Sequence, residues 1–182
     1  MPNIICVDKP VVVSQLEGKL MGFLPKGKVD VGSVAPAFTL PSQTGEMVSL
    51  EDFIGKKPVV LFFYPKDDTL GCTKEVCAFR DSFEEFGKLD AEVIGISSDS
   101  IDSHRSFAKE HSLPFTLLSD KGGKVRRLYG VPNTFGLFPG RVTYVLDREG
   151  IIRHIFSSQV AVERHVEEAF KTLRSIGSKD RI

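Results

Sequence analysis

An apolar run in the first half of the chain, followed by a helical pattern, is the clearest structural signal in this sequence. Residues 59–64 (VVLFFY) are rich in β-branched and aromatic side chains, which indicates a strand buried on both faces of a sheet. Pro65 ends this strand and a polar turn follows. From Gly71 onward apolar positions recur every three or four residues, which is the period of a helix. The helix that this spacing predicts begins at Gly71 and places on one face Cys72, Val76, Phe79, Phe83 and Phe86.

The other apolar patterns predict further strands and helices on both sides of this unit. Working along the chain, we expect strands at 36–40 and 47–50, a strand at 92–97, a helix at 100–111, a strand at 115–118, a helical turn at 124–129, a loop at 131–140, a hairpin at 142–146 and 151–156, and a helix at roughly 161–176. A βαβ half followed by a hairpin and a closing helix is the order of the thioredoxin fold. We therefore expect an N-terminal extension (1–29), one domain (30–176) and a short C-terminal tail (177–182).

Composition excludes several classes of function. The 24 basic and 24 acidic residues cancel, so no net charge favours nucleic acid or an anionic membrane. No apolar stretch approaches the ~18 residues of a membrane-spanning helix. Three cysteines are an odd number and too few for the disulfide framework of a secreted protein. They fit a reducing compartment in which thiols carry out chemistry.

The first 29 residues lack the features of a targeting segment. Asp8 falls early, no small-residue cleavage site follows an apolar core, and the segment is neither Arg-rich nor Ser-rich. We therefore expect a cytoplasmic protein, with the plastid stroma as the alternative if a leader has been removed. Cys6 is interpreted as an incidental thiol, and metal binding or intermolecular pairing is the alternative.

Cys72 occupies the position on which the chemistry depends. The first turn of a helix carries unpaired backbone N–H groups and the positive end of the helix dipole, and both stabilise a thiolate. Thr69 lies where a capping hydroxyl would sit, within reach of the Cys72 amide or sulfur. Pro65 has no N–H group and could shield the site from water. These residues indicate an activated nucleophile.

Cys77 follows five residues later, and this spacing has a structural consequence. In an intact helix the two Cα atoms would lie ~8.6 Å apart, whereas a disulfide needs roughly 4.4–6.8 Å. A Cys72–Cys77 bond would therefore require local unwinding, which suits a bond that forms and breaks. The spacing is also allowed for zinc, but no second Cys or His pair is suitably placed to complete such a site.

The run Pro65-x-x-x-Thr69-x-x-Cys72 resembles the peroxidatic-cysteine motif of peroxiredoxins. Cys77, after four intervening residues, resembles the second cysteine of the Q-type branch, also called the bacterioferritin comigratory protein group. The resemblance covers about residues 30–174, includes AFRDSFEEF, EVIGISSDS, LPFTLLSD and FPGRVTYVLDREG, and is nearest to proteins of plants, algae and cyanobacteria. Leu70 departs from the pattern, because many relatives have proline there.

The resemblance implies an α/β protein with a thioredoxin fold, peroxiredoxin-type insertions and a central mixed sheet flanked by helices. It also implies a thiol peroxidase that reduces hydrogen peroxide and organic hydroperoxides without cofactor or metal. Cys72 would become a sulfenic acid and Cys77 would resolve it as an intramolecular disulfide, which thioredoxin (or glutaredoxin) would reduce. Arg141 matches the arginine that holds the thiolate and the peroxide oxygens. Glu75 either favours the helix dipole or orients Arg141.

Several alternatives remain open at this level. The same disulfide could serve a redox-sensing or partner-binding module without useful turnover, or an oxidoreductase that acts on protein disulfides. Q-type relatives suggest a monomer, although the extension leaves room for a dimer. Surface or packing roles are expected for the four histidines, at 104, 111, 154 and 165. Phe135, Leu137 and Phe138 could line the pocket entrance, meet a reducing partner or only cover the core edge.

Overall fold

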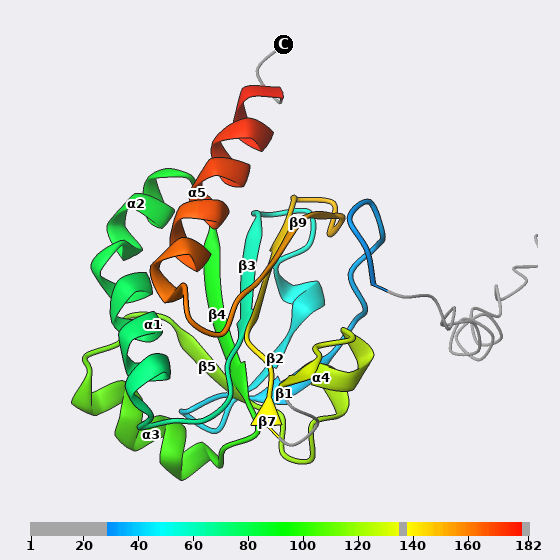
Figure 1. Cartoon of the computed structure of the whole chain (residues 1–182). Helices are drawn as coiled ribbons and strands as arrows, with labels where there is room; N and C mark the ends of the chain where they lie inside the picture. The colour runs from blue at the N-terminus through cyan, green and yellow to red at the C-terminus, as the bar shows by residue number, and fades with distance from the viewer. Residues whose placement is uncertain (1–28, 135–137, 180–182) are drawn as a thin grey trace, which may run out of the picture.

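A five-stranded mixed sheet forms the centre of the molecule (Figure 1). The computed structural model describes residues 29–134 and 138–179. The strand order is β5-β4-β3-β8-β9; β3, β4 and β5 run parallel, while β8 is antiparallel to β3 and β9 to β8. The strands are β3 (Val59–Phe63), β4 (Glu92–Ser97), β5 (Thr116–Ser119), β8 (Val142–Leu146) and β9 (Ile152–Ser157). The expected α/β fold with a central mixed sheet is confirmed.

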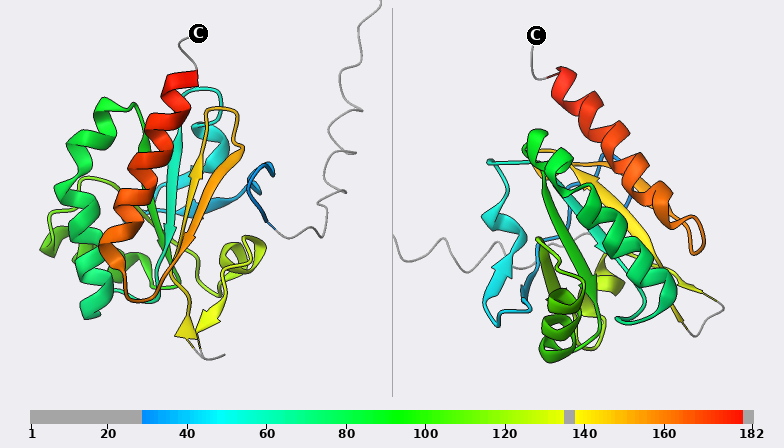
Figure 2. Two further views of the ribbon diagram at one scale, coloured as in Figure 1. Left: turned by 45° about the horizontal axis from the view of Figure 1, so that its top comes forward. Right: turned by 90° about the vertical axis from the view of Figure 1, so that its left-hand side faces the viewer.

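Helices cover both faces of this sheet, as the two further views show (Figure 2). One face packs against α1 (Leu70–Asp81), α2 (Phe83–Lys88), α3 (Ile101–Glu110) and α5 (Val162–Lys179). The other face is covered by α4 (Lys124–Leu128) and by the N-terminal elements β1 (Thr39–Pro41), β2 (Met47–Ser49) and the 3-10 helix η1 (Leu50–Asp52). The core therefore consists of two layers, one on each side of the sheet.

The alternation of side chains along β3 explains why both layers meet there. Val60 and Phe62 contribute to the cluster beneath α1 and α5, whereas Leu61 and Phe63 contribute to the opposite cluster. Every residue of β3 is 0% exposed. Successive side chains of a strand point to opposite faces, so a continuous apolar run is what a doubly covered strand requires.

Three predicted boundaries differ from the structure. The helix predicted from Gly71 through Phe86 is interrupted at Ser82, whose φ of −102° and ψ of 3° end α1 before α2 begins. The predicted loop at 131–140 includes a short antiparallel ribbon of β6 (Asn133–Thr134) and β7 (Phe138–Pro139). Helix α5 continues to Lys179, three residues past its predicted end, so the predicted tail begins inside it.

Some predictions fall on parts of the chain that the structure does not describe. These are the interpretation of residues 1–28, Cys6 included, and the role of Phe135, Leu137 and the Phe138 side chain. The division into extension, domain and tail also stays a prediction. None of the helices in the described ranges is both long enough and apolar enough to span a bilayer.

The pairing of β8 with β3 determines where the functional residues meet. Val142 pairs with Phe63, so Arg141, one residue before, comes level with Tyr64 at the end of β3. The chain leaves β3 there and enters α1 through the loop of residues 65–69. The register therefore brings Arg141 to the N-terminal end of α1, although the two are far apart in sequence.

Candidate active site

Cys72 is the third residue of α1 and is 1% exposed. At this position its backbone N–H belongs to the first turn, where the helix offers no acceptor and its dipole favours an anion. Thr69 stands at the N-cap with extended backbone angles, as expected. Its hydroxyl does not bond to Cys72, however: it is solvent-exposed and donates to the Lys66 carbonyl at 3.1 Å.

The Arg141 guanidinium lies against the Cys72 sulfur. Its Nη2 donates to Sγ at 3.4 Å and its Nη1 donates to Oε2 of Glu75. Arg141 is only 3% exposed and Glu75 is 0% exposed, so water screens neither charge well. Gly71 allows this approach, because a Cβ at that residue would lie 3.1 Å from Nη2. Glu75 thus contacts Arg141, and its expected role in orienting the guanidinium stays a prediction.

Burial perturbs the ionisation of Glu75. Desolvation raises the pKa of its carboxyl to about 8, while the charge and the hydrogen bond of Arg141 act in the opposite direction. Oε1 has no hydrogen-bond partner among the described residues. The carboxyl group is thus held next to the guanidinium in a site from which water is excluded.

His165 packs on the other side of Glu75, with Nδ1 3.8 Å from Oε1. Its ring accepts at Nδ1 from the Thr143 hydroxyl (2.8 Å) and donates from Nε2 to the Ser158 carbonyl (3.0 Å). Burial lowers the pKa of His165 to about 4, and the charge of Arg141 acts the same way. A neutral imidazole with one donor and one acceptor fits these contacts.

His165 contributes to the site although no site role was expected for it. A signal was present in the sequence: His165 follows Val162 by three residues and precedes Val166, so it shares the apolar face of α5. A histidine in such a stripe is equally compatible with core packing. The contact with Glu75 depends on where α5 crosses the sheet, which periodicity does not reveal.

A second buried network holds the loop that precedes α1. Asp67 is 3% exposed and accepts hydrogen bonds from the hydroxyls of Tyr64 (2.8 Å) and Ser103 (2.7 Å) and from Nδ1 of His104 (2.8 Å). Burial alone would raise the pKa of Asp67, but the hydrogen bonds and the charge of His104 lower it. Pro65 is half-buried in the same loop. This network joins the loop to α3 and was not predicted.

Cys77 lies in the same intact helix as Cys72 and is half-buried, and both are free thiols. Helical geometry separates their Cα atoms by ~8.6 Å, which is too far for a disulfide. The structure therefore represents the reduced pair, and any bond between the two sulfurs requires part of α1 to unwind.

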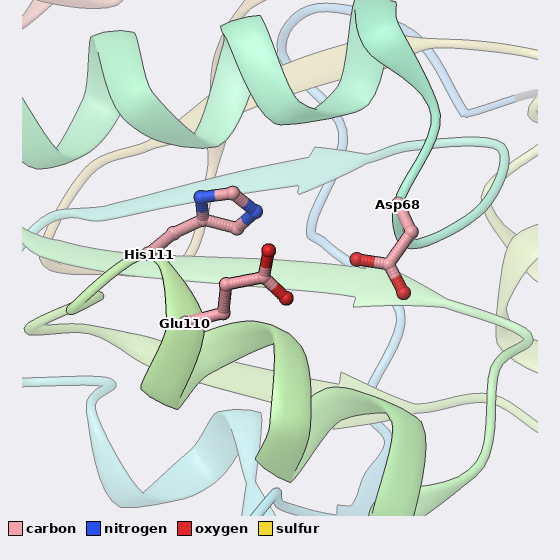
Figure 3. Close-up of side chains that lie close together, drawn as sticks. All are labelled: Asp68, Glu110 and His111. Atoms are coloured by element: carbon pink, nitrogen blue, oxygen red, sulfur yellow. The ribbon is translucent and has the colours of Figure 1, made fainter.

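A further group of possible metal ligands lies outside this site. Asp68, Glu110 and His111 bring one ligand atom each within 4.8 Å of one another. Figure 3 shows Asp68 extending from the loop before α1 toward Glu110 and His111 at the end of α3. Asp68 and Glu110 are exposed and His111 is half-buried. Water can satisfy these groups, so their proximity alone does not require a cation.

Comparisons with known proteins agree with this geometry. Residues 31–155 match the AhpC/TSA family. Peroxiredoxin Q, chloroplastic, from Triticum aestivum is 56% identical over 82% of this chain and 69% of its own length, and the protein of the same name from Arabidopsis thaliana is 52% identical over 91% and 74%.

Solved structures show the same fold. Peroxidoxin BcpB from Mycobacterium tuberculosis superposes with a TM-score of 0.76 and 37% identity, covering 81% of this chain and 98% of the other. A cysteine-to-serine mutant of PrxQ from Xylella fastidiosa gives a TM-score of 0.76 and 26% identity, covering 83% and 99%.

The expected cytoplasmic location is wrong. The plant relatives from Triticum aestivum, Sedum lineare, Oryza sativa and Arabidopsis thaliana are chloroplastic proteins. Their similarity points to the plastid, which was the alternative location. Composition and cysteine usage indicated only a reducing compartment, and several compartments meet that description.

Proposed function

Since this chain belongs to the AhpC/TSA family as a Q-type peroxiredoxin, and is therefore a thiol-dependent peroxidase, we propose that Cys72 is its peroxidatic nucleophile. The observation that carries the proposal is the 3.4 Å contact between Arg141 Nη2 and the Cys72 sulfur, at the first turn of α1. A guanidinium does not lose its proton at physiological pH, so it offers a permanent positive charge to a thiolate.

In the first step the Cys72 thiolate attacks one oxygen of the hydroperoxide. The O–O bond breaks, an S–O bond forms, and the other oxygen leaves as water or alcohol after taking a proton, which yields a sulfenic acid. Negative charge moves from sulfur to oxygen in this step. In this proposal, Arg141 and the backbone N–H groups at the start of α1 stabilise that charge, which the contact of Arg141 with the Cys72 sulfur supports.

Glu75, Thr69 and Pro65 have supporting roles in this proposal. Glu75 accepts from Nη1 of Arg141 and so fixes the direction of the guanidinium. Thr69 ends the loop, and its hydroxyl can rotate from the Lys66 carbonyl toward a bound peroxide. Pro65 is half-buried and contributes no N–H to the loop before Cys72.

In the second step the Cys77 thiol attacks the sulfur of the Cys72 sulfenic acid. The S–O bond breaks, water leaves, and a Cys72–Cys77 disulfide forms. The first turns of α1 must unwind for this step, because an intact helix holds the two Cα atoms ~8.6 Å apart. An external dithiol, thioredoxin in preference to glutaredoxin, then reduces the disulfide by exchange through a mixed disulfide. We further propose that the protein works as a monomer.

Peroxide consumption coupled to thioredoxin, thioredoxin reductase and NADPH tests this mechanism. Wild type should oxidise NADPH through many turnovers, and Cys72→Ser should abolish the reaction. Cys77→Ser should lose turnover when thioredoxin is the reductant. Turnover should return when a small thiol is the reductant, because a small thiol can attack the sulfenic acid directly. Cys6→Ser is the matched control and should behave as wild type.

Two outcomes would contradict the proposal. Sustained turnover by the Cys72→Ser variant would exclude Cys72 as nucleophile. A single turnover by wild type with both thioredoxin and glutaredoxin would favour the redox-sensing alternative. Insulin reduction by the same protein would instead indicate oxidoreductase activity toward protein disulfides.

A further inference from the structure

One buried side chain fixes the loop that connects β3 to the helix of Cys72. Of residues 65–71, all of which the structure describes, Asp67 alone is buried, with 3% of its surface exposed. Four hydrogen bonds connect Asp67 to its surroundings, and their partners are the hydroxyls of Tyr64 and Ser103, Nδ1 of His104 and the carboxylate of Asp99. The mechanism above uses none of these bonds.

His104 on α3 carries a positive charge in this arrangement. Its Nδ1 lies 2.8 Å from Oδ2 of Asp67, and its Nε2 lies 3.2 Å from the carbonyl oxygen of Leu118. Both neighbours are hydrogen-bond acceptors, so both ring nitrogens donate, and an imidazole with two N–H groups is a cation. The two side chains form a buried, charge-assisted pair between the loop and α3. We call this pair, together with the bond from Ser103 to Asp67, the loop anchor.

The residues directly after Asp67 can act as a hinge. Asp68, Thr69 and Leu70 are exposed, so the core does not enclose their side chains. Asp68 has a φ of 57°, in the left-handed region that residues other than glycine adopt infrequently. A change of backbone conformation at this residue therefore relieves an unfavourable geometry instead of creating one.

The loop anchor can stay in place while α1 opens for the resolving step. Cys72 follows Asp67 by five residues, and five extended residues span roughly 17 Å. The Cα atoms of Cys72 and Cys77 have to approach from ~8.6 Å in an intact helix to roughly 4.4–6.8 Å in a disulfide. This movement is far shorter than the reach of the loop. The unwinding can thus be confined to the residues between Asp67 and Cys77.

Loss of the loop anchor would favour the opened site over the closed one. While α1 is intact, the packing of α1 holds one end of the loop and Asp67 holds the other. Once the first turns of α1 unwind, only Asp67 restricts the loop. Release of Asp67 therefore adds more conformational freedom to the opened state than to the closed state, and this entropy stabilises the opened state.

We propose that Asp67 and His104 are positioning residues for the resolving step, which hold the start of the Cys72 loop on α3 and so limit how often α1 opens for the attack of Cys77. This inference rests on the proposed disulfide between Cys72 and Cys77. Neither residue contacts the cysteine sulfurs in the described structure. Both act through the position of the loop.

Separate rate constants for the two chemical steps test the proposal. Rapid-quench mass spectrometry after mixing with hydrogen peroxide follows the formation of the Cys72 sulfenic acid and its conversion to the disulfide. Asp67→Asn removes the charge at nearly the same shape, and disulfide formation should become about tenfold faster, which is the effect of one charge-assisted hydrogen bond. Sulfenic acid formation should change less than threefold, because the closed site remains the main population.

Two further variants test whether the residues act as one unit. His104→Asn should accelerate disulfide formation to a similar extent. The double variant Asp67→Asn/His104→Asn should be no faster than the faster single variant, since both changes break the same pair. Ser103→Ala removes only the bond of 2.7 Å to Asp67 and should give about a threefold acceleration. This milder change decides the question if the other variants do not fold in a urea unfolding control.

A buried aspartate at the other end of β8 from Arg141 supplies the matched control. Asp147 is 2% exposed and accepts from the backbone N–H of Ile151 at 2.8 Å. Asp147→Asn removes a buried charge as Asp67→Asn does, but far from the loop, and should leave the rate of disulfide formation unchanged.

The outcomes separate this inference from the proposed function. Disulfide formation that is unchanged or slower in Asp67→Asn and Ser103→Ala, or equally accelerated in Asp147→Asn, would overturn the role of the loop anchor and leave the peroxidase mechanism intact. If wild type treated with peroxide forms no bond between Cys72 and Cys77, the proposed function fails. Hydrogen exchange of the α1 amides in the reduced protein then still tests the loop anchor, because Asp67→Asn should speed this exchange about tenfold.

Discussion

At the scale of single residues, the pKa values of the ionisable groups around Cys72 depend on burial as much as on neighbouring charges. Glu75 and His165 are 0% exposed, and desolvation moves the two pKa values in opposite directions, to about 8 and to about 4. Desolvation disfavours the charged form of each group, which is the anion of a carboxyl and the cation of an imidazole. Burial therefore favours the neutral forms of Glu75 and His165, whereas a guanidinium group keeps its positive charge.

The lowered pKa of His165 predicts acid sensitivity of the fold. Between about pH 6.5 and about pH 4 the unfolded chain binds a proton at this histidine and the folded protein does not, so stability is complete above this window and falls as the pH drops through it. The difference between these two pKa values corresponds to roughly 3 kcal/mol of stability. Urea unfolding at pH 7 and pH 4 should show this loss in wild type.

His165→Gln should remove most of that pH dependence. Glutamine can still donate to the Ser158 carbonyl but does not titrate. Comparison of the variant with wild type largely cancels the contributions of other titrating groups. His111→Gln, which changes a half-buried histidine at the end of α3, should keep the full acid loss. An equal acid loss in His165→Gln and wild type would contradict the assignment of a neutral His165.

At the scale of elements, side chains of both neighbouring strands fill the space above a glycine in β4. Gly95 pairs with Phe62 of β3 on one side and with Leu117 of β5 on the other. A Cβ at this residue would lie 2.6 Å from Cζ of Phe62 and 2.7 Å from Cδ2 of Leu117. Phe62 in turn stacks on Phe79 of α1 at 4.4 Å between ring centroids. The absence of a side chain in β4 thus allows the aromatic layer beneath α1.

We expect Gly95→Ala to destabilise the protein by about 1–3 kcal/mol, because overpacking in a dense core forces side chains out of their rotamers. The matched control is Gly87→Ala in α2, where an added Cβ meets nothing within 4 Å. That change should be neutral or stabilising by up to about 1 kcal/mol, since alanine favours a helix over glycine. Urea unfolding of both variants checks the pair, and a Gly95→Ala as stable as wild type would refute the overpacking argument.

At the scale of the whole molecule, one sheet carries a core layer on each of its faces. One core layer lies between the sheet and helices α1 and α5, and the other lies between the sheet and α4. Val29 is the earliest described residue that packs against either layer. The candidate active site draws its residues from distant parts of the chain, with Cys72 on α1, Arg141 before β8 and His165 on α5. The site and the fold should therefore depend on the same cooperative structure.

A chain that begins at Val29 should keep both the fold and the activity. We expect its free energy of unfolding to stay within about 0.5 kcal/mol of that of the full chain, because it keeps every residue of the two described core clusters. Its peroxide consumption with thioredoxin should match that of the full chain. A loss above about 1 kcal/mol, or a selective loss of turnover, would show that residues 1–28 contribute to the domain or to its reductant.

The fold class and the strand and helix around Cys72 could be predicted from the order of the residues alone. Local periodicity was sufficient for β3 and α1, because a doubly buried strand and an amphipathic helix each leave a pattern of apolar residues. The spacing of Cys72 and Cys77 also fixed their separation in an intact helix. The break at Ser82 was not visible, because the apolar stripe continues across it from Phe79 to Phe86.

Which distant residues lie around Cys72 could be learned only from the folded protein. The contact of His165 with Glu75, the hydrogen bond from Arg126 of α4 to the Tyr64 carbonyl and the bonds from Asp67 to α3 depend on where each helix crosses the sheet. Arg141 was found through a family resemblance, whereas the register of β8 on β3 explains its position physically. Local patterns encode which face of an element is buried. Long-range packing determines which residues that face contacts, and the spacing of residues along the chain carries no information about it.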